Sequence, residues 1–146
     1  MANKSLLANK PNQVRIFIAD DEAKVRSALR LLLEHELELS VVGEAAEVQG
    51  LLTQVEASQP ELMLLDWELP DLSGANSATG SGSRLLAALR ARCPCLTVIA
   101  LSGRLEARQA ALAAGADAFV SKGDPPEQLL STLHTLVEEI KDSNFY

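Results

Sequence analysis

Short apolar runs, each ending at a polar residue, are the feature of this sequence that most constrains its fold. Four of them occupy residues 14–19, 62–65, 96–101 and 116–121. Runs of this length suit strands that are buried on both faces of a parallel sheet. The residues at their carboxyl ends are acids, a hydroxyl and an amine: Asp20 and Asp21, Asp66, Ser102 and Lys122. Because open α/β sheets bind ligands at the carboxyl ends of their strands, these side chains are predicted to form one site.

Amphipathic segments separate the apolar runs. Apolar residues at helical spacing predict helices over residues 22–36, 48–55, 84–92, 104–114 and 125–140, and a short further strand over 40–43. Asp21 or a neighbouring residue is expected to cap the first helix, and Gly115 to end the fourth. Five alternations of strand and helix predict an α/β fold, a flavodoxin-like doubly wound sheet of five parallel strands, (βα)5.

The composition fits one domain with an aliphatic core. The chain has 146 residues, of which 47% are hydrophobic but only 3% aromatic, so Leu, Ala, Val and Ile must fill the core. We expect a polar N-terminal tail over residues 1–13, a folded domain over 14–141 and a short tail over 142–146. A stretch rich in Pro, Ser, Gly and Asn follows Asp66, and within it residues 75–82 look like an inserted loop.

Charge and cysteine usage exclude several classes of protein. The net charge is −7 and no cluster of Lys and Arg forms a basic patch, which argues against direct binding to nucleic acid or to an anionic membrane. No apolar run has the length of a membrane span or a signal peptide, so we expect a cytoplasmic protein. Cys93 and Cys95 flank Pro94, a spacing that favours reduced structural thiols over a disulfide or a zinc site.

The grouped acids predict a metal-assisted reaction. At a separation of about 5 Å, two carboxylates repel each other by roughly 3 kcal/mol at an effective dielectric constant of about 20. Oxygen ligands without competing nitrogen or thiolate favour a hard divalent cation, and open positions for water and phosphate favour Mg²⁺. With Mg²⁺ and the Lys122 ammonium nearby, Asp66 is predicted to attack phosphorus and form an aspartyl phosphate. Ser102 could then donate a hydrogen bond to the new phosphoryl group and pull its loop inward.

Five short motifs around these residues carry a resemblance to a known family. They are Ile-Ala-Asp-Asp-Glu at 18–22, Leu-Leu-Asp at 64–66 followed by Pro70 and Gly74, Ala-Leu-Ser-Gly at 100–103, Ala-Gly-Ala at 114–116 and Phe-Val-Ser-Lys at 119–122. With them, the chain from about residue 14 to 140 resembles a response-regulator receiver domain. The resemblance covers nearly the whole predicted domain.

The resemblance implies a switch that is phosphorylated with the help of Mg²⁺. The implied site consists of the phosphoacceptor Asp66, the Mg²⁺ ligands Asp20, Asp21, Asp66 and the main-chain carbonyl of Glu68, the phosphoryl partners Ser102 and Lys122, and the switch aromatic Phe119. A receiver domain catalyses only its own phosphorylation and dephosphorylation. We therefore do not expect an enzyme that acts on other molecules.

The resemblance also implies partners. A histidine kinase or a histidine phosphotransfer protein would donate the phosphoryl group. Residues 41–45 and 122–126 are most similar to receivers that precede a helix-turn-helix output domain. Phosphorylation would change a surface made by the fourth helix, the fifth strand and the fifth helix, for a downstream effector or a missing output domain to read. A phosphorylation-dependent homodimer is also among the expected partners.

Several positions depart from the family pattern or extend it. Many receivers have a proline after the lysine, whereas this chain has Gly123, so the lysine loop must be fixed in another way. Glu68 and Arg104 lie two residues beyond Asp66 and Ser102, and we expect them to overhang the pocket and tune the lifetime of the phosphoryl group. No output domain follows residue 140, so we expect either a receiver standing alone or a fragment of a longer protein.

Other interpretations of the same residues stay open. Taken singly, Asp20 and Asp21 suit a helix cap, Lys122 a surface lysine and Phe119 a core residue. Residues 80–84 are more typical of a flexible linker than of a phosphate-binding loop, because the Gly-Lys-Ser/Thr ending is missing. Three alternative functions remain: a receiver-shaped interaction module that works without phosphorylation, an aspartate-nucleophile phosphohydrolase, and the receiver fragment of a DNA-binding transcriptional regulator.

Overall fold

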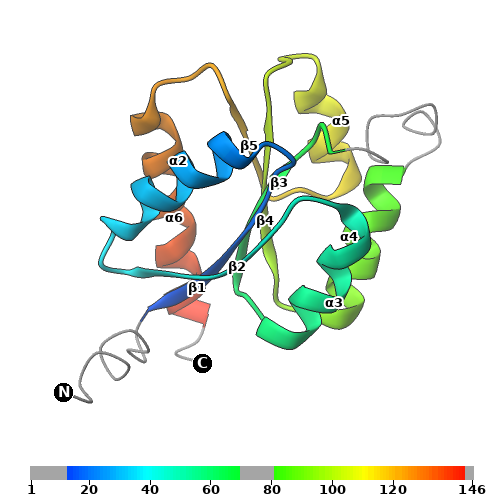
Figure 1. Cartoon of the computed structure of the whole chain (residues 1–146), viewed down its shortest axis with the longest axis horizontal. Helices are drawn as coiled ribbons and strands as arrows, with labels where there is room; N and C mark the ends of the chain where they lie inside the picture. The colour runs from blue at the N-terminus through cyan, green and yellow to red at the C-terminus, as the bar shows by residue number, and fades with distance from the viewer. Residues whose placement is uncertain (1–12, 70–80, 144–146) are drawn as a thin grey trace.

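Strands and helices alternate throughout the described part of the chain, which the computed structural model gives for residues 13–69 and 81–143 (Figure 1). In chain order the elements are β1 (Val14–Ala19), α2 (Ala23–Glu34), β2 (Leu39–Ala45), α3 (Val48–Ser58), β3 (Leu62–Asp66), α4 (Ser81–Arg92), β4 (Thr97–Ser102), α5 (Ala107–Ala114), β5 (Ala118–Ser121) and α6 (Pro126–Ser143). The predicted tails over 1–12 and 144–146, and residues 75–80 of the predicted insertion, lie outside the described residues.

The strands form one parallel sheet with the order β2-β1-β3-β4-β5, which confirms the predicted flavodoxin-like fold. The order follows from the winding of the chain: β2 pairs on one side of β1 and β3 on the other. The direction of winding therefore reverses beside β1, and at such a point the loops leaving neighbouring strands diverge and open a crevice. The carboxyl ends of β1 and β3 border this crevice.

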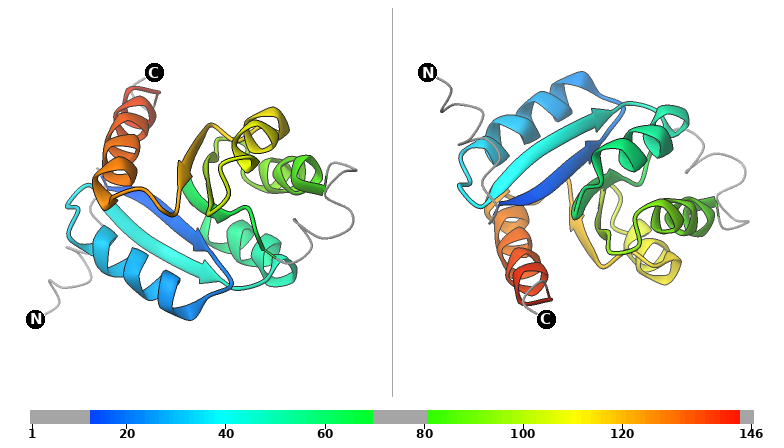
Figure 2. Two further views of the ribbon diagram at one scale, coloured as in Figure 1. Left: turned by 90° about the horizontal axis from the view of Figure 1, so that it is seen from above. Right: turned by 90° about the horizontal axis from the view of Figure 1, so that it is seen from below.

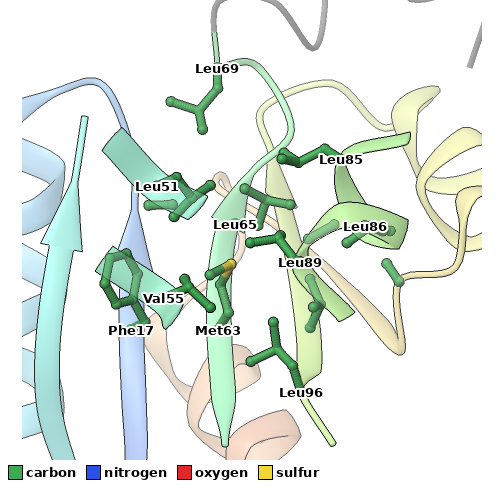
Figure 3. Close-up of a cluster of buried hydrophobic side chains, with 14 of the residues drawn as sticks. Phe17, Leu51, Val55, Met63, Leu65, Leu69, Leu85, Leu86, Leu89 and Leu96 are labelled. Carbon is green, nitrogen blue, oxygen red and sulfur yellow. The ribbon is translucent and has the colours of Figure 1, made fainter. Parts of the chain in front are cut away.

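Helices cover both faces of the sheet (Figures 1 and 2). α2 and α6 pack on one face, where Leu33 and Leu133 are fully buried against Ile16 and Leu64 of the strands. α3, α4 and α5 pack on the other face. The side chains between these helices and the sheet form a buried hydrophobic cluster, shown in Figure 3. It includes Phe17, Leu51, Val55, Met63, Leu65, Leu86 and Leu89. The two aliphatic layers hold the strands, and with them the strand ends, in fixed positions.

The third helix, α4, begins earlier than the sequence indicates. α4 starts at Ser81, so the prediction of a flexible linker over residues 80–84 is wrong from residue 81 onward. The cause is packing: a Cβ atom placed on Gly82 would lie 2.5 Å from Cζ2 of Trp67. The missing side chain lets the indole ring lie against the first turn of α4, and this contact overrides the loop-like composition.

Two other helix starts also differ from expectation. α5 begins at Ala107 instead of residue 104, after turns in which Ala107 N–H donates to Arg104 O and Arg108 N–H to Leu105 O. At the start of α2 the N-cap residue is Glu22, a neighbour of Asp21 as the prediction allowed, but its side chain makes no capping hydrogen bond. The C-cap prediction for α5 is correct, because Gly115 has a φ of 116°.

Within residues 13–69 and 81–143, no helix is both long enough and apolar enough to cross a bilayer. Cys93 and Cys95 carry free thiols. The buried Cys93 Sγ lies 3.1 Å from the carbonyl oxygen of Pro60.

Candidate functional site

Four strand ends bring the predicted side chains together. Asp20 follows β1, Asp66 ends β3 and Ser102 ends β4, and all three residues are 0% exposed. Lys122 follows β5, and its Nζ lies 3.0 Å from Asp66 Oδ1 and 3.2 Å from Asp20 Oδ2. Asp21 is exposed at the rim, and one carboxylate oxygen from each of the three aspartates lies within 4.8 Å of the others.

Main-chain hydrogen bonds fix the loops that carry these side chains. Trp67 N–H donates to Leu101 O over 2.7 Å, which ties the end of β3 to β4. Glu68 N–H donates to Asp66 Oδ1 over 2.9 Å and so orients the carboxylate. Lys122 N–H donates to the carbonyl of Ser102 over 2.9 Å. The geometry of the site is therefore built into the edge of the sheet.

The charges of Asp66 and Lys122 are strongly linked. Burial raises the pKa of Asp66 to about 6, with a further push from the Asp20 carboxylate, although the Glu68 N–H and Lys122 act in the opposite direction. Burial works against the Lys122 ammonium, but its contacts with Asp66 and Asp20 outweigh this effect and raise its pKa. The ammonium is thus held between two buried carboxylates.

The donor set of the three aspartates fits a hard cation. Asp66 Oδ2 is buried and accepts no hydrogen bond from any described residue. Asp20 Oδ2 likewise accepts none from the described residues, and its 3.2 Å contact with Lys122 Nζ is an ion pair without hydrogen-bond geometry. Buried carboxylate oxygens with free lone pairs need a partner, and a divalent cation that takes oxygen ligands is a suitable one. The exposed side of Asp21 leaves room for water in the coordination sphere.

Glu68 and Arg104 are placed differently from each other. Glu68 Oε1 accepts a hydrogen bond from Gly103 N–H over 3.3 Å and lies 3.9 Å from Lys122 Nζ, so this carboxylate overhangs the site. Arg104 contributes its N–H, which donates to Ser102 Oγ over 3.0 Å, while its guanidinium pairs with Glu106. A modulating role for either residue stays a prediction, as does a metal contact by the Glu68 carbonyl.

Phe119 lies in β5, next to the Lys122 loop. It is partly buried against the core cluster on the α3–α5 side, and the Arg108 guanidinium lies 6.0 Å from its ring centre. Both the core and the switch interpretations are compatible with this position, so the switch role stays a prediction.

Hydrogen bonds set the Lys122 loop where many receivers have a proline. Gly123 N–H donates to Ser121 Oγ over 3.2 Å, Asp124 N–H donates to Ser121 O over 3.1 Å, and Ser121 N–H donates to Asp124 Oδ2 over 3.3 Å. Ser121 and Asp124 therefore close the turn that presents Lys122.

Arg26 also touches the site, although no sequence pattern indicates it. Nη1 of Arg26, in the first turn of α2, donates to the carbonyl oxygen of Asp20 over 2.7 Å. Arg26 lies six residues after Asp20 in the sequence. This spacing predicts the contact only when the shape of the turn between β1 and α2 is given.

Comparison with known proteins assigns the family. The family model for the response regulator receiver domain matches residues 16–134. The chain belongs to this family, as the motifs around Asp20, Asp66, Ser102 and Lys122 indicated. It is a receiver domain of the two-component response regulators, related to those of NarL type.

Its relatives include whole regulators that are longer than this chain. The DNA-binding transcriptional activator DevR/DosR of Mycobacterium tuberculosis is 37% identical over 111 residues, which are 75% of this chain and 48% of that protein. The nitrate/nitrite response regulator NarL of Escherichia coli is 29% identical over 119 residues, 82% of this chain and 52% of that protein. This chain thus spans about half the length of these regulators.

Other relatives extend the comparison. A protein-glutamate methylesterase/protein-glutamine glutaminase of Symbiobacterium thermophilum is 33% identical over 130 residues, which are 87% of this chain but only 33% of that enzyme. Among solved structures, a CheY-like receiver domain protein of Methanospirillum hungatei superimposes with a TM-score of 0.73 and 28% identity, over 90% of this chain and 98% of that one.

Proposed function

We propose that Asp66 accepts a phosphoryl group with the help of Mg²⁺, and that this modification changes a surface that a partner reads. The observation that carries the proposal is the buried Asp66 Oδ2, which accepts no hydrogen bond from the described residues although the same carboxylate contacts Lys122. A buried polar atom without a partner is costly and needs an explanation. A nucleophilic oxygen that must reach phosphorus explains it.

The surrounding side chains suit transfer of a phosphoryl group to Asp66. An Asp66 oxygen forms a bond to phosphorus while the bond from phosphorus to the donor nitrogen of a phosphohistidine breaks, and that nitrogen leaves with the electron pair. Lys122 Nζ, 3.0 Å from Asp66 Oδ1, stabilises negative charge on the transferring oxygens. The Ser102 hydroxyl, on the neighbouring strand, donates a hydrogen bond to the product. The chain would therefore catalyse only its own phosphorylation and dephosphorylation.

The acidic cluster would hold the metal. Asp20, Asp21 and Asp66 supply carboxylate oxygens, and the main-chain carbonyl of Glu68 is proposed as a further ligand. Bound Mg²⁺ would supply positive charge that offsets the repulsion between these carboxylates and an incoming phosphate. The residues themselves orient the nucleophile, because Glu68 N–H and Lys122 Nζ both hold Asp66 Oδ1.

The partners follow from the family and from the charge of the chain. A histidine kinase or a histidine phosphotransfer protein would donate the phosphoryl group in the cytoplasm to a domain that spans residues 14–141. The changed surface would involve α5, β5 and α6, with Phe119 as the switch aromatic. DevR/DosR is a DNA-binding activator, but this chain has a net charge of −7. We therefore expect that any contact with DNA is made by an output domain or an effector protein and not by this acidic domain.

The test is phosphorylation with a small donor. The chain is incubated with acetyl phosphate, with Mg²⁺ or with EDTA, and incorporated phosphate is measured by phosphate-affinity electrophoresis and intact mass. We expect incorporation only with Mg²⁺, loss of incorporation in Asp66→Ala, and normal incorporation in Asp142→Asn, which changes an exposed aspartate at the end of α6.

Absence of Mg²⁺-dependent incorporation in the unmodified chain would contradict the proposal and favour the interaction module that works without phosphorylation. Repeated turnover of a small phosphate ester would favour the phosphohydrolase.

A further inference from the structure

We propose that Arg26 is a positioning residue for the acidic turn, and that Glu44 holds Arg26 in place for this purpose. The inference rests on the proposed function, because the turn contains Asp20 and Asp21, two of the proposed Mg²⁺ ligands. It assigns a role in metal binding to two side chains that would not touch the metal.

The turn is fixed at Asp20 from three directions. Asp20 N–H donates to Ala45 O over 3.0 Å, and Asp20 Oδ1 accepts from Glu22 N–H over 2.9 Å. The third bond comes from Arg26, whose Nη1 donates to Asp20 O over 2.7 Å. The main chain on both sides of the Asp20 Cα is therefore held, and Asp20 Oδ2 is the oxygen left to face the site.

Arg26 is in turn held from the sheet. Glu44 lies near the end of β2, in register with Ile18 of β1, and its Oε1 lies 3.4 Å from Arg26 Nε. The side chains of Arg26 and Glu44 are only 20% and 27% exposed, so solvent screens this pair less than a surface pair. The guanidinium spans the gap between the edge strand and the turn that carries the acids.

The other two bonds at Asp20 hold its N–H and its carboxylate, so among the described residues Arg26 is the side chain that holds its carbonyl. The N-cap residue Glu22 makes no side-chain capping bond. Without the Arg26 contact, the Asp20 carbonyl would lose its charged donor, and the turn could rotate about the neighbouring residues. Metal affinity depends steeply on ligand geometry, and groups that orient ligands from outside the coordination sphere commonly matter about 10-fold or more.

Arg30 provides a matched control, because it shares Glu44 but not the turn. Arg30 lies one helical turn beyond Arg26. Its Nε lies 2.6 Å from Glu44 Oε2, and its Nη1 lies 3.9 Å from Glu34 Oε2. Arg30→Ala removes a positive charge and an ion pair of Glu44, as Arg26→Ala does, but it leaves the bond to the Asp20 carbonyl intact. A difference between the two variants therefore isolates that bond.

The experiment measures the Kd for Mg²⁺ by titration of the fluorescence of Trp67, the single tryptophan, which adjoins Asp66. The rise in melting temperature with Mg²⁺ concentration gives a second measure. We expect Arg26→Ala to weaken Mg²⁺ binding about 10-fold, Arg30→Ala to leave it unchanged, and Arg26→Lys and Glu44→Gln to give intermediate values. Melting temperatures in EDTA and circular dichroism show whether each variant is folded.

Equal Kd values for Arg26→Ala and the unmodified chain would overturn the inference, and so would equal weakening in Arg26→Ala and Arg30→Ala. If Arg26→Ala does not fold, Arg26→Lys and Glu44→Gln decide: unchanged Mg²⁺ affinity in both overturns the inference. In these outcomes the unmodified chain still binds Mg²⁺ and takes up phosphate, so the proposed function stands. If the unmodified chain does neither, the proposed function fails and this inference fails with it.

Discussion

Asp66 is the residue at which stability and proposed function conflict most directly. It is fully buried and close to Asp20, and the compensating contacts from Glu68 N–H and Lys122 do not restore its ordinary pKa of 3.8. A bound cation would offset the Asp66 charge, which is costly in the resting protein. The predictions at this scale concern the two charges of the pair.

Asp66→Asn should stabilise the metal-free protein at pH 8. The pKa of Asp66 is raised to about 6 in the folded state, so between pH 4 and 6 the folded state retains a proton that the unfolded state has lost. Stability therefore falls as pH rises through this window, and the cost persists above it. Asparagine removes the charge, and we expect a gain on the order of 1–3 kcal/mol. Urea unfolding in EDTA measures it.

The gain should shrink as the pH is lowered to about 4, where the Asp66 carboxyl in the folded protein is protonated. Equal or lower stability of Asp66→Asn at pH 8 would show that the carboxylate is better compensated than its contacts indicate.

Lys122→Met should have the opposite effect on stability. It leaves Asp66 and Asp20 without the ammonium that lies within 3.2 Å of both. Removing one partner of a buried ion pair commonly costs about 3–5 kcal/mol. Because the lysine is partly exposed, we expect a loss at the lower end of this range at pH 8, and a smaller loss at pH 5, below the Asp66 pKa of about 6, where the Asp66 carboxyl takes up a proton. Urea unfolding at both pH values checks this, and an equal loss at both would refute the electrostatic origin.

At the scale of elements, packing decides where helices begin. The sequence around α4, with two glycines and two serines, is typical of a loop, yet the helix starts at Ser81 because Trp67 lies against Gly82. This contact joins the residue after Asp66 to the first turn of α4, and it links the site to the helix across the segment 70–80.

Gly82→Ala should destabilise the protein, although alanine favours helix by about 1 kcal/mol. Its Cβ would meet two atoms of the rigid indole ring at 2.5 and 2.6 Å, and such overpacking costs about 1–3 kcal/mol. We also expect the fluorescence of Trp67 to change. Thermal unfolding and emission spectra give both results.

Gly50→Ala is the control for this change. Gly50 lies in α3, and among the described residues a Cβ there would lie nearest the flexible end of Gln54, at 3.4 Å. We expect Gly50→Ala to stabilise the protein by about 0.5–1 kcal/mol. If Gly82→Ala and Gly50→Ala both stabilise the protein, the contact with the Trp67 ring does not require glycine at position 82.

At the scale of the whole molecule, the parallel sheet turns four distant segments into one site. This much was predictable, because apolar runs define the strands and the residues after them must meet at one edge. The fold and the site residues Asp20, Asp66, Ser102 and Lys122 were predicted in this way. Arg26 was not, because it acts through a main-chain carbonyl and leaves no pattern in the sequence. The start of α4 was missed because a tertiary contact determines it.

Ligand binding should stabilise the whole domain. Mg²⁺ with beryllofluoride, a phosphoryl mimic, should raise the melting temperature, since a ligand that binds only the folded state stabilises it by mass action. Asp66→Ala should show no rise from beryllofluoride. Differential scanning calorimetry measures both, and an unchanged melting temperature in the unmodified chain would contradict an intact phosphoryl pocket.

The central claim is that the side chain of Asp66 becomes the phosphorylated group. Treatment with acetyl phosphate and Mg²⁺, followed by borohydride, reduces an aspartyl phosphate to homoserine, which peptide mass spectrometry locates. We expect homoserine at position 66 in the Mg²⁺ sample and none in the EDTA sample. Homoserine at another aspartate, or none at all in a sample that has taken up phosphate, would contradict the claim.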